Sequence, residues 1–431
     1  MTNRPRIIVV YDLSAAAPVE IVAGLRPLAE VTFAVHPSSF SLPLLPHLRE
    51  LADVVMLGEP DSLARLRALA PDAVVTFSDR VVSTTAEIAE ELGLPYHSVA
   101  CAHLLTDKYL QRERLSEQGV GTARNALLRS PSDWPEALTR IGLPAVLKPV
   151  HGEGSRNTYK IEDTAEGAEA ARLLVEELLG GARAAGEGPA EAALVLETFL
   201  TGVEQDPFAD YVSVESVVSH GTVSHLAVTG KFRQPPPFRE VGQFWPAPLD
   251  PGGKEAVLDL TTRAVTALGI RTGVLHTEVK LTAQGPEVIE VNGRLGGMID
   301  QLCRTATGVD LIGIAGRLAL GEHIVMPELA LDGVTFQHCT LTPVEAFRLE
   351  KIHGAATVRR TPGITAYRPR IRAGRELEAS VGTRYLDYLC GTAPDHEAMT
   401  KLLDTVLDEL SFTFTLPTGP TTLTARELTA V

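Results

Sequence analysis

The chain has 431 residues, a length that predicts about two to four domains, because one domain usually holds ~100 to 200 residues. Apolar residues make up 45% and charged residues 22% of the sequence, the composition of a globular protein that can bury a core. The net charge of −15 opposes non-specific binding to nucleic acid and to anionic lipid, which excludes both as expected partners.

The cysteines and the N-terminal sequence predict a cellular compartment. Cys101, Cys303, Cys339 and Cys390 are widely spaced and form no C-x-x-C motif, which argues against a disulfide framework and a structural zinc site. The aliphatic run at residues 7–10 is too short for a signal peptide, and no stretch reaches the ~20 apolar residues of a membrane span. We therefore expect a cytoplasmic protein that does not enter a membrane.

Short β-branched runs alternate with helical patterns from residue 6 to about residue 100. The runs are IIVV, VTFAV, DVVML and DAVVTF, and segments such as 62–70 and 84–93 separate them. This alternation is typical of a parallel sheet covered by helices. The first strand leads into LSAAAPVE, which has no glycine, and no G-x-x-x-x-G-K-[ST] motif occurs. The absence of both nucleotide-binding loops argues against a nicotinamide-linked oxidoreductase.

The middle of the chain begins with a predicted helix from an N-cap at Thr106 to a stop at Gly119. The elements that follow are a strand at 144–149, a loop at 151–159, a helix at 164–179, a surface connection at 180–192, strands at 194–200, 211–218 and 223–230, a proline-rich loop at 232–248 and a helix at 253–268. After a hairpin, a helix at 310–321 and a strand-rich tail complete the chain.

The hairpin at residues 276–297 carries the clearest chemical signal. If its turn centres on Gln284, Glu278 lies opposite Glu290 and His276 lies opposite Asn292. Side-chain alternation then places Glu278, Lys280, Glu290 and Asn292 on one face, and Val279, Leu281, Ile289 and Val291 on the other. Facing carboxylates repel, so they need a cation. A divalent ion such as Mg²⁺ suits two carboxylates and an amide, while surface lysines are the alternative that the pairing leaves open.

Several motifs in order resemble the ATP-grasp superfamily: LKP with its glycine loop, LETFLTGVE, HTEVKL and EVNGR. They are most similar to the carboxylate–amine ligases that join amino acids into dipeptides or amides. The resemblance implies an α/β chain with an N-terminal parallel βα domain (1–105), a two-sheet ATP-grasp domain (106–325, with a mobile lid at about 146–230) and a C-terminal strand-rich domain (326–431).

The resemblance also implies an ATP site between two sheets. Lys148 and Lys108 would contact the phosphates, and the loop with Gly154 and Ser155 would close over them through backbone amides. The remaining implied contacts are Glu197, Phe199 and Leu200 at the adenine and Glu204 at the ribose. An ordinary turn for the loop and a core position for Phe199 remain alternatives.

For the reaction, the resemblance implies that Glu278, Glu290 and Asn292 hold one or two Mg²⁺ ions, with Mn²⁺ as a substitute. Arg294, assisted by Lys148, would stabilise the charge on the transferring phosphoryl group. The substrate carboxylate attacks the γ-phosphate, an amine captures the acylphosphate, and ADP and phosphate leave. The resemblance implies small-molecule carboxylates and amines as partners. Whether the chain forms a homodimer is left undecided.

The proline-rich loop is the expected substrate wall. Related dipeptide ligases have a glutamate followed by Gly-His here, whereas this chain has Glu240 and then Gln243 in place of the histidine. Gln243 cannot act as a titratable base, which leaves the acceptor substrate undefined. Gly297 and Met298 are expected to line the acyl pocket. A rigid linker and a core methionine are the structural alternatives.

Two other functions fit the same motifs. One is an ATP-binding sensor or scaffold without catalysis, although it would not need Arg294 and the glutamates. The other is a carboxylase-type enzyme of the same superfamily.

Overall fold

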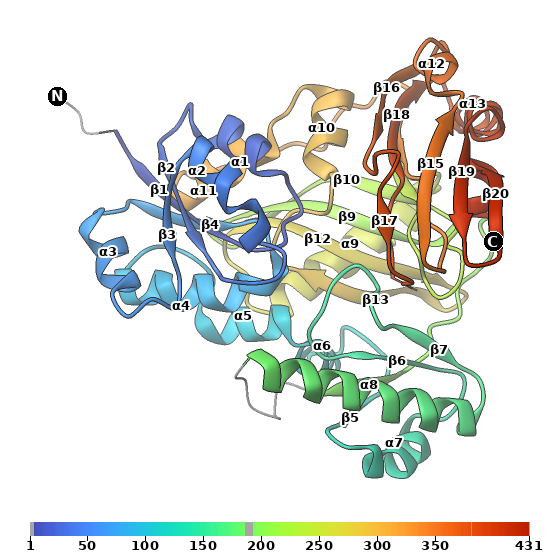
Figure 1. Ribbon diagram of the computed structural model, residues 1–431. Helices are drawn as coiled ribbons and strands as arrows, with labels where there is room; N and C mark the ends of the chain where they lie inside the picture. Colours follow the sequence, from blue (N-terminus) through green and yellow to red (C-terminus); the bar gives the residue numbers. More distant parts are fainter. Residues whose placement is uncertain (1–3, 186–192, 381, 431) are drawn as a thin grey trace.

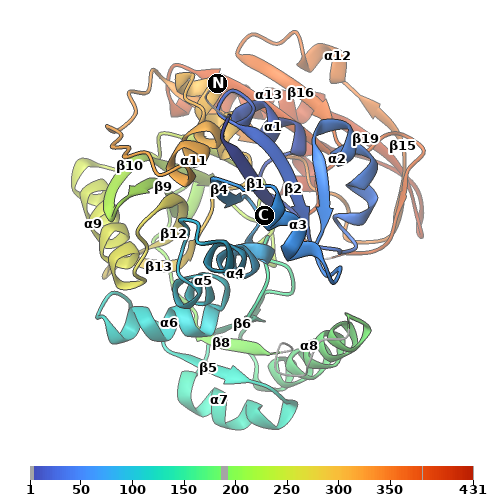
Figure 2. The same cartoon turned by 90° about the vertical axis from the view of Figure 1, so that its left-hand side faces the viewer.

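The computed structural model describes residues 4–185, 193–380 and 382–430, which form four β-sheets with flanking helices (Figure 1). The N-terminal sheet has the order β3-β2-β1-β4 and is parallel, which confirms the expected parallel domain. Its elements are β1 Arg6–Tyr11, α1 Pro18–Leu25, β2 Glu30–Val35, η1 Leu42–Leu44, α2 Leu45–Leu51, β3 Asp53–Met56, α3 Ser62–Ala68, β4 Ala73–Thr76, η2 Asp79–Val81 and α4 Val82–Leu92. Figure 2 shows the sheet between its helices.

Two helices, α5 (Val99–Thr106) and α6 (Lys108–Glu117), connect this domain to the rest of the chain. The N-cap of α6 is Asp107, whose carboxylate accepts a hydrogen bond from the Leu110 amide at 2.8 Å. The predicted cap at Thr106 was wrong, because that residue ends α5 and its hydroxyl donates to the Ala102 carbonyl.

The second sheet is small, antiparallel and ordered β5-β8-β6-β7. It consists of β5 Asn125–Leu128, β6 Ala145–Pro149, β7 Tyr159–Ile161 and β8 Leu194–Thr198, with η3 Pro131–Asp133, α7 Trp134–Ile141 and α8 Thr164–Ala185 alongside. The two α-helices pack on the sheet through one apolar cluster that includes Trp134 and Leu147. Helix α8 continues through Ala185, so the predicted surface connection at 180–192 is helical at its start; residues 186–192 lie outside the described residues.

The largest sheet has eight strands in the order β13-β12-β9-β10-β11-β14-β18-β16 and extends past residue 326. Its strands are β9 Phe208–Ser219, β10 Thr222–Phe232, β11 Gly242–Trp245, β12 Gly273–Thr282, β13 Gly285–Asn292, β14 Val334–His338, β16 Ile364–Pro369 and β18 Asp387–Ala393. Strand β11 lies inside the region predicted as a proline-rich loop. One apolar cluster joins this sheet to α9 (Pro251–Ala267). A second apolar cluster joins other residues of the sheet to α10 (Ile299–Thr307), α11 (Leu311–Ala319) and the N-terminal domain.

The β12–β13 register matches the prediction at the site and departs from it near the turn. Glu278 pairs with Glu290 and His276 with Asn292, but Thr282 pairs with Gly285, and the register shifts after Glu278. Ile289 is the extra residue. It lines a cavity, whereas Val288 is buried in the core, so the placement of Ile289 on the core face was wrong.

The C-terminal sheet is antiparallel and ordered β17-β15-β19-β20. Its region contains β15 Phe347–His353, α12 Ala355–Val358, β17 Glu376–Leu377, α13 His396–Glu409, β19 Ser411–Leu416, β20 Gly419–Thr424 and α14 Ala425–Thr429. The four cysteines are buried and free. In the described ranges, every helix is too short or too polar to span a bilayer.

Candidate active site

A cavity of about 460 Å³ lies among the small sheet, the hairpin, the proline-rich loop and the C-terminal region. That volume is in the usual range for a small-molecule site. The predicted site residues that line it are Lys108, Lys148, Gly154, Ser155, Glu197, Phe199, Leu200, Glu240, Gln243, Glu278, Glu290, Arg294, Gly297 and Met298.

Two predicted residues do not line the cavity. The Glu204 side chain is 77% exposed and pairs with Arg233 at 2.7 Å. Asn292 is buried beside the cavity, and its Nδ2 donates to Glu290 Oε1 and to the His276 carbonyl, both at 3.3 Å. Its Oδ1 receives no hydrogen bond from the described residues and is the amide atom left for a cation.

Lys148 on β6 and Glu197 on β8 form a buried ion pair at 2.8 Å. Arg112 of α6 approaches the same carboxylate at 3.4 Å. Burial raises the pKa of Glu197, but Arg112 and Lys148 outweigh it and hold the pKa below its usual value. The carboxylate therefore fixes both cations at the cavity wall. Sequence reasoning missed Arg112, which belongs to no recognised motif.

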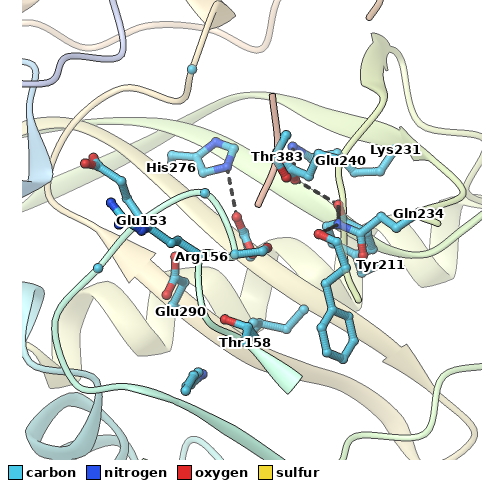
Figure 3. Close-up of a pocket in the computed structure, with 18 of the residues that line it drawn as sticks. Glu153, Arg156, Thr158, Tyr211, Lys231, Gln234, Glu240, His276, Glu290 and Thr383 are labelled. Atoms are coloured by element: carbon cyan, nitrogen blue, oxygen red, sulfur yellow. Dashed lines mark hydrogen bonds and ion pairs between the residues drawn. The ribbon is translucent and has the colours of Figure 1, made fainter. Parts of the chain in front are cut away.

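The glycine loop is tied to its surroundings at several points. Lys108 Nζ donates to the Gly152 carbonyl at 2.6 Å and lies 3.4 Å from Glu290. Glu153 pairs with Arg80 of the N-terminal domain at 2.8 Å. Figure 3 shows this loop, with Glu153 and Thr158, in front of Glu290. The loop thus lies across the cavity with its backbone near both the lysine and the carboxylates.

The two hairpin glutamates face one another across β12 and β13. Burial raises the pKa of Glu290, but Lys108, Lys148 and Arg294 lower it to about 2. In the part of the chain that the structure describes, no group of three or more His, Cys, Asp or Glu side chains is arranged to hold a metal. A divalent ion here would therefore rely on both glutamates, Asn292 Oδ1 and oxygens of a bound phosphate, a donor set that suits Mg²⁺.

His276 lies between two carboxylates. Its Nδ1 donates to Glu215 at 2.9 Å, and its Nε2 lies 3.6 Å from Glu278. Glu215 is buried and also accepts from Ser213 and Thr229. Burial lowers the pKa of His276, but Glu215 outweighs it and raises the pKa to about 9. A fixed positive imidazolium thus faces Glu278. Glu215 was not singled out, although its strand, DYVSVESVV at 210–218, is one of the stretches that resemble the carboxylate–amine ligases.

Arg294 projects from the loop after β13. Its guanidinium donates to the Leu295 carbonyl at 2.9 Å and pairs with Asp79 of η2. Burial lowers the pKa of Arg294, but Asp79, Glu153 and Glu290 together outweigh it and hold the pKa above its usual value. The N-terminal domain therefore orients an arginine of the cavity, a contact that the sequence did not predict.

The substrate wall is held by amide and lysine side chains. Glu240 accepts from Tyr211 at 2.9 Å and lies 3.6 Å from Lys231. Lys231 donates to Gln243 at 3.1 Å, and Gln243 donates to the Gly297 carbonyl at 2.9 Å. Gln243 therefore positions the loop that carries Gly297.

Comparison with known proteins identifies the domain. Residues 141–301 match the ATP-grasp domain family, so the chain carries an ATP-grasp domain, which confirms the resemblance. Alanine–anticapsin ligase of Bacillus subtilis (strain 168) is 28% identical over 61% of this chain and 57% of its own length. Human carnosine synthase 1 is 29% identical over 65% of this chain and 34% of its own length. This chain thus spans only part of these relatives.

Solved structures give the same fold over nearly the whole chain. L-amino acid ligase from Bacillus licheniformis superposes with a TM-score of 0.75 at 22% identity, covering 95% of this chain and 98% of that one. N5-carboxyaminoimidazole ribonucleotide synthetase from Thermus thermophilus superposes with a TM-score of 0.67 at 19% identity, covering 94% and 98%. The predicted α/β ATP-grasp architecture is confirmed.

Proposed function

We propose that this chain is an ATP-dependent ligase that joins the carboxylate of one amino acid or similar acid to an amine through an acylphosphate, releasing ADP and phosphate. The observation that carries the proposal is the convergence of Glu278, Glu290 and Arg294 with the Lys231–Glu240 pair in one cavity. The first group suits phosphoryl transfer, and the second suits a substrate with an ammonium group. The names of the relatives, alanine–anticapsin ligase and carnosine synthase, support the same class.

The nucleotide would occupy the end of the cavity next to the small sheet. Lys108, Lys148 and the amides of the glycine loop would bind phosphates, and Val146 and Ile289 offer apolar contacts for a base. Glu197 would act there through Lys148, and Phe199 and Leu200 border the same space. A ribose contact by Glu204 would require this residue to break its ion pair with Arg233.

Magnesium, or manganese as a substitute, would be held by Glu278, Glu290 and Asn292, and it would neutralise phosphate charge when bound. Arg294, oriented by Asp79, would stabilise the charge that develops on the transferred group. Gln243 does not titrate, so Glu240 is the group on the substrate wall that can accept from an ammonium. Burial raises the pKa of Glu240, but Lys231, Tyr211 and His276 together hold it below its usual value. A cytoplasmic location and a homodimer stay predictions.

The test is ADP release by the whole chain with Mg²⁺-ATP and a panel of amino-acid pairs, with products identified by mass. We expect release that needs two amino acids and is lost in Glu290→Gln. Glu287→Gln serves as control, because Glu287 is a half-buried glutamate on the same strand that accepts from Thr122 and lies outside the cavity lining. Release with bicarbonate and a single amine would indicate a carboxylase-type enzyme instead. ATP binding without release across the panel would refute the ligase and indicate a sensor or scaffold.

A further inference from the structure

Three residues of the C-terminal region line the same cavity: Arg370, Thr383 and Tyr385. Arg370 follows β16, and the other two precede β18. They lie beyond residues 141–301, the part of the chain that matches the family model. Figure 3 shows Thr383 entering on the same side of the cavity as Glu240 and Lys231.

The backbone around these residues is ordered by hydrogen bonds. The Arg370 amide donates to the Leu386 carbonyl at 2.8 Å, and the Thr342 amide donates to the Arg384 carbonyl at 2.9 Å. Tyr385 also forms an antiparallel bridge with Leu341. Arg370 therefore projects from a paired segment, so its position does not depend on a free loop.

Arg370 and two arginines outside the cavity lining, Arg239 and Arg384, bring positive charge to this region without a matching carboxylate. Arg239 donates to the Thr342 carbonyl at 2.7 Å, and Arg384 donates to the Glu378 carbonyl at 2.7 Å. Among the described residues, Arg239, Arg370 and Arg384 have no ion-pair partner, and the guanidinium of Arg370, an exposed residue, also has no hydrogen bond to protein. Burial lowers the pKa of Arg239, and the charge of Arg384 lowers it further. The nearby Glu240 is already engaged by Lys231 and Tyr211.

Three buried donors in this region also lack partners within the described ranges, and one of them, on Thr383, belongs to a residue that lines the cavity. They are the Thr383 hydroxyl, the Arg239 Nε and the Arg384 Nε. Burying a donor without a partner is unfavourable, and so is placing guanidinium groups together without an anion. An anion bound at Arg370 and Thr383 would give the Thr383 hydroxyl an acceptor and offset the positive charge of the guanidinium groups, because a carboxylate can accept from a guanidinium and a hydroxyl at once.

We propose that Arg370 and Thr383 form a subsite for a substrate carboxylate other than the one that is activated. The inference rests on the proposed ligase function. The activated carboxylate belongs beside Glu278, Glu290 and Arg294, whereas Arg370 and Thr383 line the cavity from the C-terminal region. Two sources share this chemistry: the free α-carboxylate of the acceptor amino acid, and the second carboxylate of a diacid donor.

The test uses the whole chain and an amino-acid pair that supports ADP release. Steady-state constants are measured with the acceptor as its free acid and as its amide, and with the donor as a diacid and as its mono-acid analogue. If the acceptor supplies the carboxylate, wild type should show a KM at least about tenfold lower for the acid than for the amide. Arg370→Gln should raise the acid KM about 10- to 100-fold and leave kcat, the amide KM and the ATP KM within about twofold.

If the donor supplies the carboxylate, Arg370→Gln should raise the KM of the diacid donor about 10- to 100-fold and leave the KM of the mono-acid donor unchanged. Arg370→Lys should restore part of the lost affinity, and Arg368→Gln, an exposed arginine of β16 outside the cavity lining, should change nothing. Equal KM values for acid and amide, and for diacid and mono-acid, with no effect of Arg370→Gln would overturn the subsite while leaving the ligase intact. No ADP release from wild type with any pair would overturn both.

Discussion

The ion pair between Asp79 and Arg294 allows a direct test of how the N-terminal domain contributes to the reaction. The two side chains are 15% and 12% exposed, so solvent screens the pair only weakly. Asp79→Asn keeps the shape of the side chain and removes the charge that orients the guanidinium. Because Asp79 acts through Arg294, the loss should fall on turnover rather than on nucleotide binding.

The expected size follows from the kind of contact that is lost. A hydrogen bond to a charged group contributes roughly 1.5–3 kcal/mol. At ~1.4 kcal/mol for each tenfold change in rate, kcat should fall about 10- to 100-fold. The KM for ATP should change by less than about threefold, because Lys108 and Lys148 are untouched.

The assay is steady-state ADP release at saturating amino acids, with the melting temperature recorded for each variant. Asp259→Asn is the matched control, since it removes an exposed pair with Arg263 at 2.9 Å on α9. A kcat for Asp79→Asn within twofold of wild type would refute the reasoning. So would a large rise in the KM for ATP at unchanged kcat, which would assign Asp79 to nucleotide binding.

Two further predictions concern the loop and the core. Arg80→Ala removes the partner of Glu153 and should raise the KM for ATP about two- to fivefold with kcat nearly unchanged. The effect is small because a part-exposed ion pair contributes only ~0.5–1 kcal/mol. Arg65→Ala, which loses an exposed ion pair with Glu59, is the control. Burial raises the pKa of Asp387 from 3.8 to about 6, so its contribution to stability is full below pH 4 and is lost as the pH rises through 6. Relative to wild type, Asp387→Asn should therefore gain ~3 kcal/mol of unfolding free energy between pH 4 and pH 7. Urea unfolding across that range measures it, and a constant difference would contradict the pKa shift.

The hairpin illustrates what local sequence can establish. Alternation and turn residues were enough to place Glu278 opposite Glu290, because a strand has two faces and one of them was plainly apolar. They could not predict the bulge at Ile289. In the structure, Arg112 of α6 donates to the Val288 carbonyl at 2.6 Å and to the Ile289 carbonyl at 2.8 Å, so a residue distant in sequence satisfies two backbone carbonyls of this edge strand at the bulge.

The substrate wall shows the same limit at longer range. The loop at 232–248 was identified from its proline content, but its strand β11 forms only because β10 and β14 supply partners on either side. Arg370 carries no motif at all. It reaches the cavity because β16 pairs with β18 and β18 pairs with β14, contacts between segments that local patterns cannot connect.

The charge of the site explains how an acidic chain can serve anionic substrates. The net charge of −15 repels polyanions at a distance, yet the cavity gathers Lys108, Lys148, Lys231, Arg294 and Arg370. Most of these cations are held by a buried or facing carboxylate, and such pairs fix their positions while limiting the field that they project. Arg370 is the exception among them within the described residues. A cavity built this way selects small anions that can reach its cations. Arg156 of the glycine loop also lines it without an ion pair among the described residues, and Arg370 is the unpaired cation of the C-terminal region, where we propose that a second substrate carboxylate binds.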